Sequence, residues 1–582
     1  MIRHINNRKS TLLDNKYWEF FIPTILMAMT LTMSVVVDAV IVGNMLGSEA
    51  LAAVNLVMPV IMIYNTVAVS LGMGGATLIS VAKGRRQGEY ANDIFTVVLI
   101  GLFSVSFLLL ACQELFLVDI TKILTREPSL RPLVSAYLHV LVYGTPLIII
   151  VLGLVYSLRI DGRVKLASTV LIASNLVNLV LDLVYMGPMK LGIAGSSLAT
   201  VSGYAVGAGF LFVYIFSNKR TLRFSVSTLL RLPKFGRCLL RILSTGTPAA
   251  MGSILVTIKI LCINHIVLAV AGKSGMVAFS VCLSCLSFVS MFISGAAQAM
   301  TPIVGVLYGE NDYTGVHFVV LRAAKTLLVS SVLVTLLLEC VPGIVLQMFG
   351  VHHPADIAEG IPAIRLFSLS LVGTSITFLS IYYFMTIGRT KFSTVISMVE
   401  GLSVIPIALT LSQLWGSAGV WIAFSMAEIV TISMIVTCCI YLMRKSPEAY
   451  KSPLLLDRRI LGDTRILETT ITSSNELREG AREGIAGLLD SLEIKQEKLE
   501  MIRKAVIKAV DDVAEQAYPQ GERGYLDLLV RVYDDRIVAS LRDNGMGVDL
   551  SGNSFLSQSL PDSVKIEQAQ AIGFNTITLT SQ

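Results

Sequence analysis

Residues 18–41 read WEFFIPTILMAMTLTMSVVVDAVI, with Glu19 and Asp38 as the only ionisable side chains. A helix needs about 20 mainly apolar residues to cross roughly 30 Å of hydrocarbon. The run is too long for the apolar core of a cleavable signal peptide, and it lacks a small-residue cleavage site. It therefore predicts a first membrane span.

Eleven further runs of this kind follow the first one. The chain has 582 residues, of which 54% are hydrophobic and 15% charged. An ordinary soluble protein is roughly a quarter charged, so a single large water-soluble globule is excluded. The twelve predicted spans lie at about 18–41, 51–82, 93–116, 133–156, 166–186, 191–216, 245–271, 276–300, 325–348, 362–387, 392–412 and 417–442.

Charge divides the chain into two unlike parts. Residues 1–445 hold 30 Lys and Arg against 18 Asp and Glu, whereas residues 446–582 hold 16 against 22. A hydrophobic, basic membrane part is thus followed by a small acidic soluble part. The predicted division is a first six-helix lobe at 1–218, a cytosolic inter-lobe segment at 219–244, a second six-helix lobe at 245–445, a linker at 446–465 and a cytosolic α+β domain at 466–582.

The distribution of Lys and Arg in the loops predicts the orientation. Basic residues in short loops resist translocation and stay on the cytosolic side. If both termini are cytosolic, the inner segments before the twelfth span hold 21 Lys and Arg, and the outer segments hold 6. We therefore expect both termini, and with them the acidic domain, to face the cytosol.

An internal duplication relates the two lobes. Gly84 and Gly309 lie 225 residues apart in similar surroundings. Residues 192–195 and 416–419 match at an offset of 224, and residues 162–165 and 388–391 match at 226. Parallel repeats of this kind are typical of secondary transporters, in which a substrate cavity between the lobes opens alternately to each side.

Two acids interrupt the apolar runs of the first lobe. They are Asp38, and Asp182 with Asn178 four residues before it on the same helix face. An ionisable group at mid-membrane costs about 2.5–3.5 kcal/mol on insertion scales and is a functional candidate by default. The duplication places Ile263 and Pro406 at the equivalent positions of the second lobe, so neither acid has a twin. A scaffold residue tends to recur in both lobes, whereas a cation site needs to exist once.

A pair of carboxylates in a low-dielectric chamber can take up a proton, or hold Na⁺ with amide and hydroxyl oxygens. The second lobe carries a different pair of charges inside its apolar runs, Lys259 and Glu400. These two residues could line a substrate cavity, where Glu400 would attract a cationic compound.

Residues 18–442 resemble the prokaryotic branch of the multidrug and toxic compound extrusion (MATE) family. The likeness rests on Pro23, on residues 37–43 (VDAVIVG), on the glycine-rich 71–75, on the Asn178 to Asp182 pair, and on residues 192–200 (GIAGSSLAT). The resemblance implies a first-lobe cation site of Asp38, Asn178 and Asp182, with Thr200 adding an oxygen and Pro23 allowing the first helix to bend. It also implies H⁺ or Na⁺ as coupling ion and no required cofactor.

The C-terminal part is predicted to contain strands at 466–472, 524–533, 536–542 and 575–581, with helices near 475–490 and 497–518. Its Asp543-x-Gly545-x-Gly547 turn resembles the ATP-binding domain of histidine kinases and anti-sigma-factor kinases. The resemblance implies that Asp543 would receive the adenine amino group. Lys508 and Asp512 stand where that family carries Glu and a Mg²⁺-holding Asn, and no second glycine-rich lid follows, which argues against bound ATP and Mg²⁺ and against phosphotransfer.

The sequence therefore predicts an all-α membrane protein of twelve helices in two pseudo-symmetric lobes, with a small C-terminal α+β sandwich. The expected function is export of amphipathic, often cationic compounds across a lipid bilayer, without nucleic-acid or metal partners beyond Na⁺. The C-terminal domain would serve as a regulatory or protein-binding module. Two alternatives stay open at this stage, a lipid-linked precursor flippase of the same superfamily and a membrane-tethered nucleotide-binding sensor or kinase.

Overall fold

The computed structural model describes most of the chain. It covers residues 10–125, 127–217, 220–229, 232–447, 450, 454–456, 464–472, 483, 486–487, 496–517, 523–532, 536–545 and 564–581. Within these residues, eleven helices are long and apolar enough to cross a membrane. One of them, α11 (Leu232–Gly309), contains two spans, because Gly272 at φ 59° and ψ −147° breaks it in the middle. The architecture thus agrees with the predicted twelve spans.

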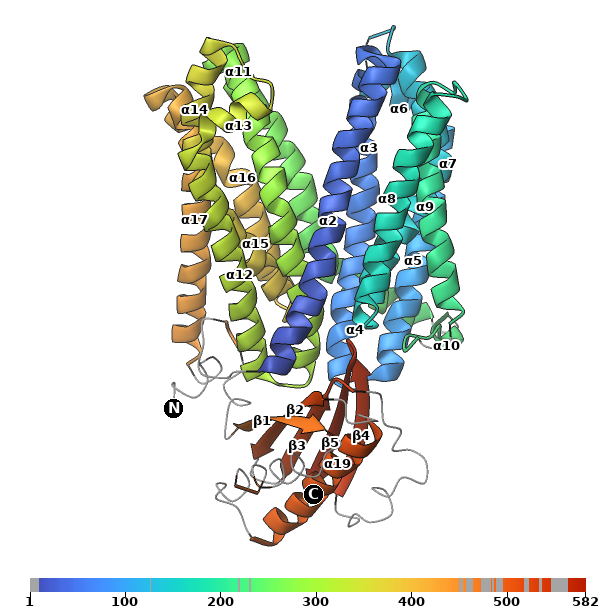
Figure 1. Ribbon diagram of the computed structural model, residues 1–582, viewed down its shortest axis with the longest axis vertical. Helices are drawn as coiled ribbons and strands as arrows, with labels where there is room; N and C mark the ends of the chain where they lie inside the picture. Colours follow the sequence, from blue (N-terminus) through green and yellow to red (C-terminus); the bar gives the residue numbers. More distant parts are fainter. Residues whose placement is uncertain are drawn as a thin grey trace.

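Two helical lobes stand side by side (Figure 1). The first consists of α2 (Thr11–Leu46), α3 (Ser48–Ala68), the π-helical turn η1 (Val69–Met73), α4 (Gly74–Gly84), α5 (Gly88–Leu115), α6 (Leu117–Leu124), α7 (Arg131–Ile160), α8 (Val164–Met186) and α9 (Ile193–Ile215). A short α10 (Val226–Leu229) leads to α11. The second lobe continues with α12 (Tyr313–Cys340), α13 (Pro342–Met348), α14 (Pro354–Ser368), α15 (Ser370–Thr386), α16 (Thr390–Trp415) and α17 (Ser417–Lys445).

The duplication is visible in the backbone as well as in the sequence. Gly162 and Gly388 have φ of 79° and 80°, and Gly192 and Gly416 have φ of 61° and 58°. A positive φ of this kind favours glycine, which has no Cβ to clash. The matched glycines therefore make the same turns at equivalent places in the two lobes.

The lobes diverge at one end and meet at the other, next to the C-terminal domain (Figure 1). We call these the far end and the near end. At the near end, an ideal Cβ on Gly84 would lie 2.9 Å from the Cα of Gly309, so α4 and α11 are in direct backbone contact. Arg159 of α7 also donates a hydrogen bond of 2.5 Å to Gln298 of α11.

Large apolar side chains remain exposed along the helices, among them Phe107, Leu108, Val213 and Leu333. In water such a surface would be unfavourable, whereas hydrocarbon accepts it. The main core of each lobe is separate, with the second lobe also packing Tyr17 and Phe20 from the start of α2. The molecule is therefore a multi-pass membrane protein.

The C-terminal domain is an antiparallel sheet in the order β1-β2-β3-β5-β4, with α19 (Gln496–Gln516) against it. The strands are β1 (Thr464–Thr472), β2 (Arg523–Val532), β3 (Ile537–Asp543), β4 (Val564–Ala571) and β5 (Phe574–Ser581). The four expected strands and the expected helix near 497–518 are present, and β4 was not predicted. Most of residues 475–490, where a further helix is expected, lie outside the described residues.

Strand alternation divides the sheet into two faces. Leu528, Leu541 and Leu579 pack against α19. The opposite face carries polar side chains and lies against the near end of the lobes (Figure 1). The β4–β5 hairpin also reaches the lobes, because Ile572 and Phe574 at its tip are buried in a hydrophobic cluster formed by the second lobe and the start of α2, and Gly573 lies against Gly162 of the first lobe.

Candidate functional site

The residues of the predicted first-lobe site come together from three helices. Asn178 and Asp182 lie one turn apart on α8, and the Asn178 Nδ2 donates to the Asp182 Oδ2 at 3.2 Å. The same amide group lies 3.3 Å from the Thr200 Oγ1 on α9. Asp38 on α2 lies beside Asp182, close enough for the two carboxyl groups to interact electrostatically. All four predicted residues thus share one site.

Close helix packing positions these side chains. Gly203 on α9 lies so near α8 that an ideal Cβ would be 2.4 Å from the Ser174 carbonyl oxygen and 3.1 Å from the Asn178 Cβ. Only glycine permits this approach without a shift of the backbone. One turn before Gly203, Thr200 is consequently held against Asn178.

Each of the two acids has one carboxylate oxygen without a hydrogen-bond donor among the described residues. Asp182 is fully buried, and Asn178 is 6% exposed. Among the described residues, the Oδ1 atoms of Asp38 and Asp182 receive no hydrogen bond from a donor. A buried carboxylate oxygen without a donor is costly, so the site is suited to a proton or a small cation. The arrangement can hold either one with oxygen atoms already in place.

Three further residues line this site, and none of them was predicted from the sequence. The Ser34 Oγ lies 3.4 Å from the Asn178 Oδ1, and Ser196 lies beside Asp182. Tyr137 of α7, 4% exposed, lies beside both acids and Thr200. Ser34 could have been found, because it precedes Asp38 by one helical turn. Tyr137 had no such signal, since only tertiary packing brings α7 to the site.

Pro23 lies within α2, which continues as one helix through it. Proline has no N–H, so the helix lacks one backbone hydrogen bond at this turn. The Ser168 hydroxyl of α8 donates to the Pro23 carbonyl at 2.9 Å, which ties this part of α2 to α8. The weakened turn is thus on the same helix pair as the acids.

The second lobe contains a cavity of about 420 Å³ that Lys259 and Glu400 both line. They form an ion pair of 2.5 Å and are 13% and 3% exposed. Glu428 lies in the same cavity and accepts hydrogen bonds from Thr374 at 2.8 Å and Thr377 at 2.7 Å. Lys259 pairs with Glu400, whereas the described partners of Glu428 are hydroxyl groups. Most of the remaining lining is apolar, including Phe279, Phe378 and Phe424.

The predicted nucleotide residues of the C-terminal domain are only partly brought together. The buried Asp543 Oδ1 accepts hydrogen bonds from the Gly545 N–H at 2.9 Å and from the Asn575 Nδ2 at 3.0 Å. Burial raises the pKa of the Asp543 carboxyl, and these two hydrogen bonds oppose the shift. Asp512 lies half-buried on α19. Gly547 lies outside the described residues.

The paired lobes, the membrane-spanning helices and the polar sites inside them are the architecture of a multi-pass membrane transporter. A sequence model of the MatE family matches residues 23–184 and 248–410, more than half of the chain. The chain therefore belongs to the MatE family. The two matched segments begin 225 residues apart, one in each lobe, and the second ends before the C-terminal domain.

Individual relatives agree with this assignment. The chain is 25% identical over 430 residues to the "Probable multidrug resistance protein YoeA" of Bacillus subtilis (strain 168), covering 72% of this chain and 91% of the relative. It is 23% identical over 422 residues to the "Multidrug export protein MepA" of Staphylococcus haemolyticus (strain JCSC1435), covering 71% and 90%. The crystal structure of a MATE protein in complex with MaL6 has the same fold, with a TM-score of 0.69 at 22% identity over 75% of this chain and 97% of that one.

Proposed function

We propose that this protein is a secondary active antiporter that exports drugs or other amphipathic, often cationic compounds in exchange for inward H⁺ or Na⁺. The observation that supports it best is the first-lobe site, where Asp38 and Asp182 face each other beside Asn178 and Thr200. The relatives named as multidrug resistance and multidrug export proteins support the choice of substrate class.

The physical basis of coupling is the cost of two close carboxylates. When neither acid is neutralised, two like charges share a poorly solvated site, and the helices that carry them favour separation. Binding of H⁺ or Na⁺ removes this cost and favours the closed arrangement of α2 against α8. A bound ion therefore shifts the balance between conformations by its difference in affinity for the two states. Pro23 lets α2 respond, because its turn lacks one backbone hydrogen bond.

The cavity of the second lobe is the proposed drug site. It combines aromatic walls with Glu400 and Glu428, which suits an apolar compound carrying one positive charge. Lys259 would adjust the affinity, since it competes with the compound for the Glu400 carboxylate.

The proposed orientation follows the basic loops, with both termini and the C-terminal domain in the cytosol of a bacterial cell. The near end is then the cytosolic end, and the arrangement in Figure 1 is closed to the cytosol. On this basis we also propose the division into lobes at 1–218 and 245–445, an inter-lobe segment at 219–244, a linker at 446–465 and a regulatory domain at 466–582.

Transport by purified protein in liposomes tests the proposal. Efflux of a cationic dye should be driven by an imposed pH gradient or by an imposed Na⁺ gradient, and Asp38→Asn or Asp182→Asn should reduce it at least tenfold. Asp119→Asn, an exposed acid on α6, serves as the matched control and should transport normally. Full coupled efflux in both site variants would refute the carboxylate mechanism. Movement of a lipid-linked precursor without dye efflux would favour the flippase alternative instead.

A further inference from the structure

The polar face of the C-terminal sheet is bound to both lobes at once. Arg542, 4% exposed, pairs with Glu310 and, at 3.2 Å, with Asp312, both in the loop between α11 and α12 of the second lobe. From the first lobe, Arg86 in the loop between α4 and α5 pairs with Glu567 and hydrogen-bonds to Thr578. The domain therefore bridges the two lobes.

These two loops are equivalent in the duplication and touch each other. Arg86 has φ of 60° and Asn311 has φ of 61°, at an offset of 225 residues. Just before them, Gly84 and Gly309 bring α4 and α11 into backbone contact. The sheet consequently spans the lobes at the place where they must separate if the near end is to open.

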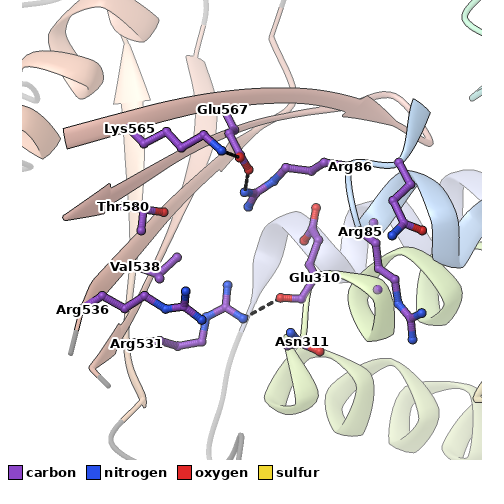
Figure 2. Close-up of a pocket in the computed structure, with 13 residues that line it drawn as sticks. Arg85, Arg86, Glu310, Asn311, Arg531, Arg536, Val538, Lys565, Glu567 and Thr580 are labelled. Carbon is purple, nitrogen blue, oxygen red and sulfur yellow. Dashed lines mark hydrogen bonds and ion pairs between the residues drawn. The ribbon is translucent and has the colours of Figure 1, made fainter. Parts of the chain in front are cut away.

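A cavity of about 880 Å³ lies between the sheet and the two loops (Figure 2). Its size is within the range of small-molecule sites. Five basic side chains line it, Arg85, Arg86, Arg531, Arg536 and Lys565, against the two acids Glu310 and Glu567. The lining thus has a formal net charge of +3, with its basic side chains supplied by the first lobe and by the sheet.

The acids of the lining are already engaged. Glu310 accepts from Arg542 and Glu567 from Lys565 and Arg86, and these contacts lower the pKa of Glu567. Arg531 is 5% exposed and donates to the neutral Glu310 carbonyl at 2.6 Å and to the Ser540 hydroxyl at 3.3 Å. Its Nε has no hydrogen-bond partner among the described residues. In Figure 2, Arg86 and Arg531 reach in from opposite sides.

The buried Arg531 guanidinium, which has only neutral acceptors among the described residues, favours a ligand that brings an anionic one. Arginine binds phosphate through paired N–H donors, and several arginines around one cavity favour a ligand with several phosphates. We propose that this cavity binds a soluble cytosolic molecule carrying two or more phosphate groups, and that the bound molecule keeps the near end of the transporter closed. The inference of a cytosolic ligand rests on the proposed orientation.

Binding can be tested without transport. Isothermal titration calorimetry of the full chain in detergent, with inorganic pyrophosphate and separately with ATP, should show saturable binding. Arg536→Ser and Arg85→Ser should each weaken it at least tenfold, whereas Lys504→Ser, exposed on α19 and thus on the other face of the sheet, should not. Absence of saturable binding of both probes at millimolar concentration would overturn the proposal. Equal affinity in wild type and both arginine variants would also overturn it.

Asp543→Asn separates this cavity from the other candidate nucleotide site. Asp543 lies at the turn after β3, and its side chain accepts hydrogen bonds from Asn575 and Gly545. It is not among the residues that line the cavity. ATP binding that disappears in Asp543→Asn and persists in Arg536→Ser would place the nucleotide at that turn and overturn the proposal. Retained binding of pyrophosphate in Asp543→Asn supports the cavity.

Closure is measured by a distance across the far end. Spin labels at Lys122→Cys and Met348→Cys, both exposed, report on the two lobes in a background without native cysteines. Pyrophosphate should shift the distance distribution toward the longer population, and the shift should be absent in Arg536→Ser. Binding without any shift would overturn the closure part of the proposal. A protein that binds and shifts but fails to export dye would count against the proposed transport function alone.

Discussion

Replacing Arg542 with Met should release the C-terminal domain from the second lobe. Arg542 faces Glu310, Asp312 and Asp527, whose side chains are 6%, 0% and 2% exposed. Burial lowers the pKa of the guanidinium, but these three carboxylates outweigh it and raise the pKa above its ordinary value. Met preserves most of the side-chain volume and removes the charge.

The size of the effect follows from the buried acids that would lose their partner. Removing one member of a buried ion pair costs about 3–5 kcal/mol, because the remaining charge stays desolvated. Every 1.4 kcal/mol is roughly a factor of ten in an equilibrium constant. The equilibrium constant for docking of the C-terminal domain on the lobes should therefore fall roughly a hundredfold to a few thousandfold. Asp527 belongs to the same sheet as Arg542, so a part of this cost falls on the fold of the domain itself.

Hydrogen exchange measured by mass spectrometry separates docking from folding. In Arg542→Met, exchange should rise in peptides covering 84–87 and 309–312, and much less in the α19 peptide that packs on the other face of the sheet. Arg503→Met, on α19, is the matched control and should leave both loops unchanged. Unchanged exchange at 309–312 in Arg542→Met would refute the reasoning. Equal rises in all peptides would show that the domain had unfolded.

Three more outcomes are expected. In Gly84→Ala, the added Cβ would lie 2.1 Å from the Val306 carbonyl oxygen, so the near end should fail to close and the spin-label distance across the far end should shorten. In Lys259→Met, Glu400 is left buried and unpaired, which should lower the free energy of unfolding in detergent by about 3 kcal/mol, and adding Glu400→Gln should restore most of it. Because burial raises the pKa of Asp543, the folded domain binds its proton more tightly than the unfolded chain does. Its contribution to stability should therefore fall as pH rises through the folded pKa, and Asp543→Asn should flatten this part of a pH series of thermal unfolding.

Each of these outcomes has a result that contradicts it. Gly88→Ala is the control for the first, since nothing lies within 4 Å of its Cβ position; equal distances in the two variants would show that the glycine contact does not set closure. For the second, a double variant no more stable than Lys259→Met would show that the lost ion pair is not the cause. For the third, an unchanged pH dependence of thermal unfolding in Asp543→Asn would show that the Asp543 carboxyl does not cause it.

Part of the predicted ion site can be recognised from the sequence alone. Asn178 and Asp182 are four residues apart, so any helix places them on one face. Asp38 is an acid in an apolar run, which marks it without reference to its neighbours. That Asp38 meets Asp182 is a tertiary fact, because it depends on how α2 packs on α8. The same holds for Tyr137, whose surroundings in the sequence resemble those of any packed aromatic residue.

The interface of the C-terminal domain could be predicted even less. Ile572 and Gly573 both adopt positive φ, at 52° and 76°, in the two-residue turn between β4 and β5. Positive φ is unfavourable for a β-branched residue such as Ile572, whose side chain is buried where the hairpin tip meets the lobes. Arg531 and Arg542 similarly look like ordinary exposed positions of an alternating strand. Their burial arises only when another surface covers that face of the sheet.

The sequence by itself determined the membrane spans, the duplication and the lone acids, because hydropathy, periodicity and repeat offsets are properties of local composition. Only the tertiary structure decided which charges pair between the C-terminal domain and the lobes, that Lys259 pairs with Glu400, and that a basic cavity forms beside the two loops. The physical reason is that charge pairing and burial depend on distances between residues remote in the chain. No local pattern of residues encodes those distances.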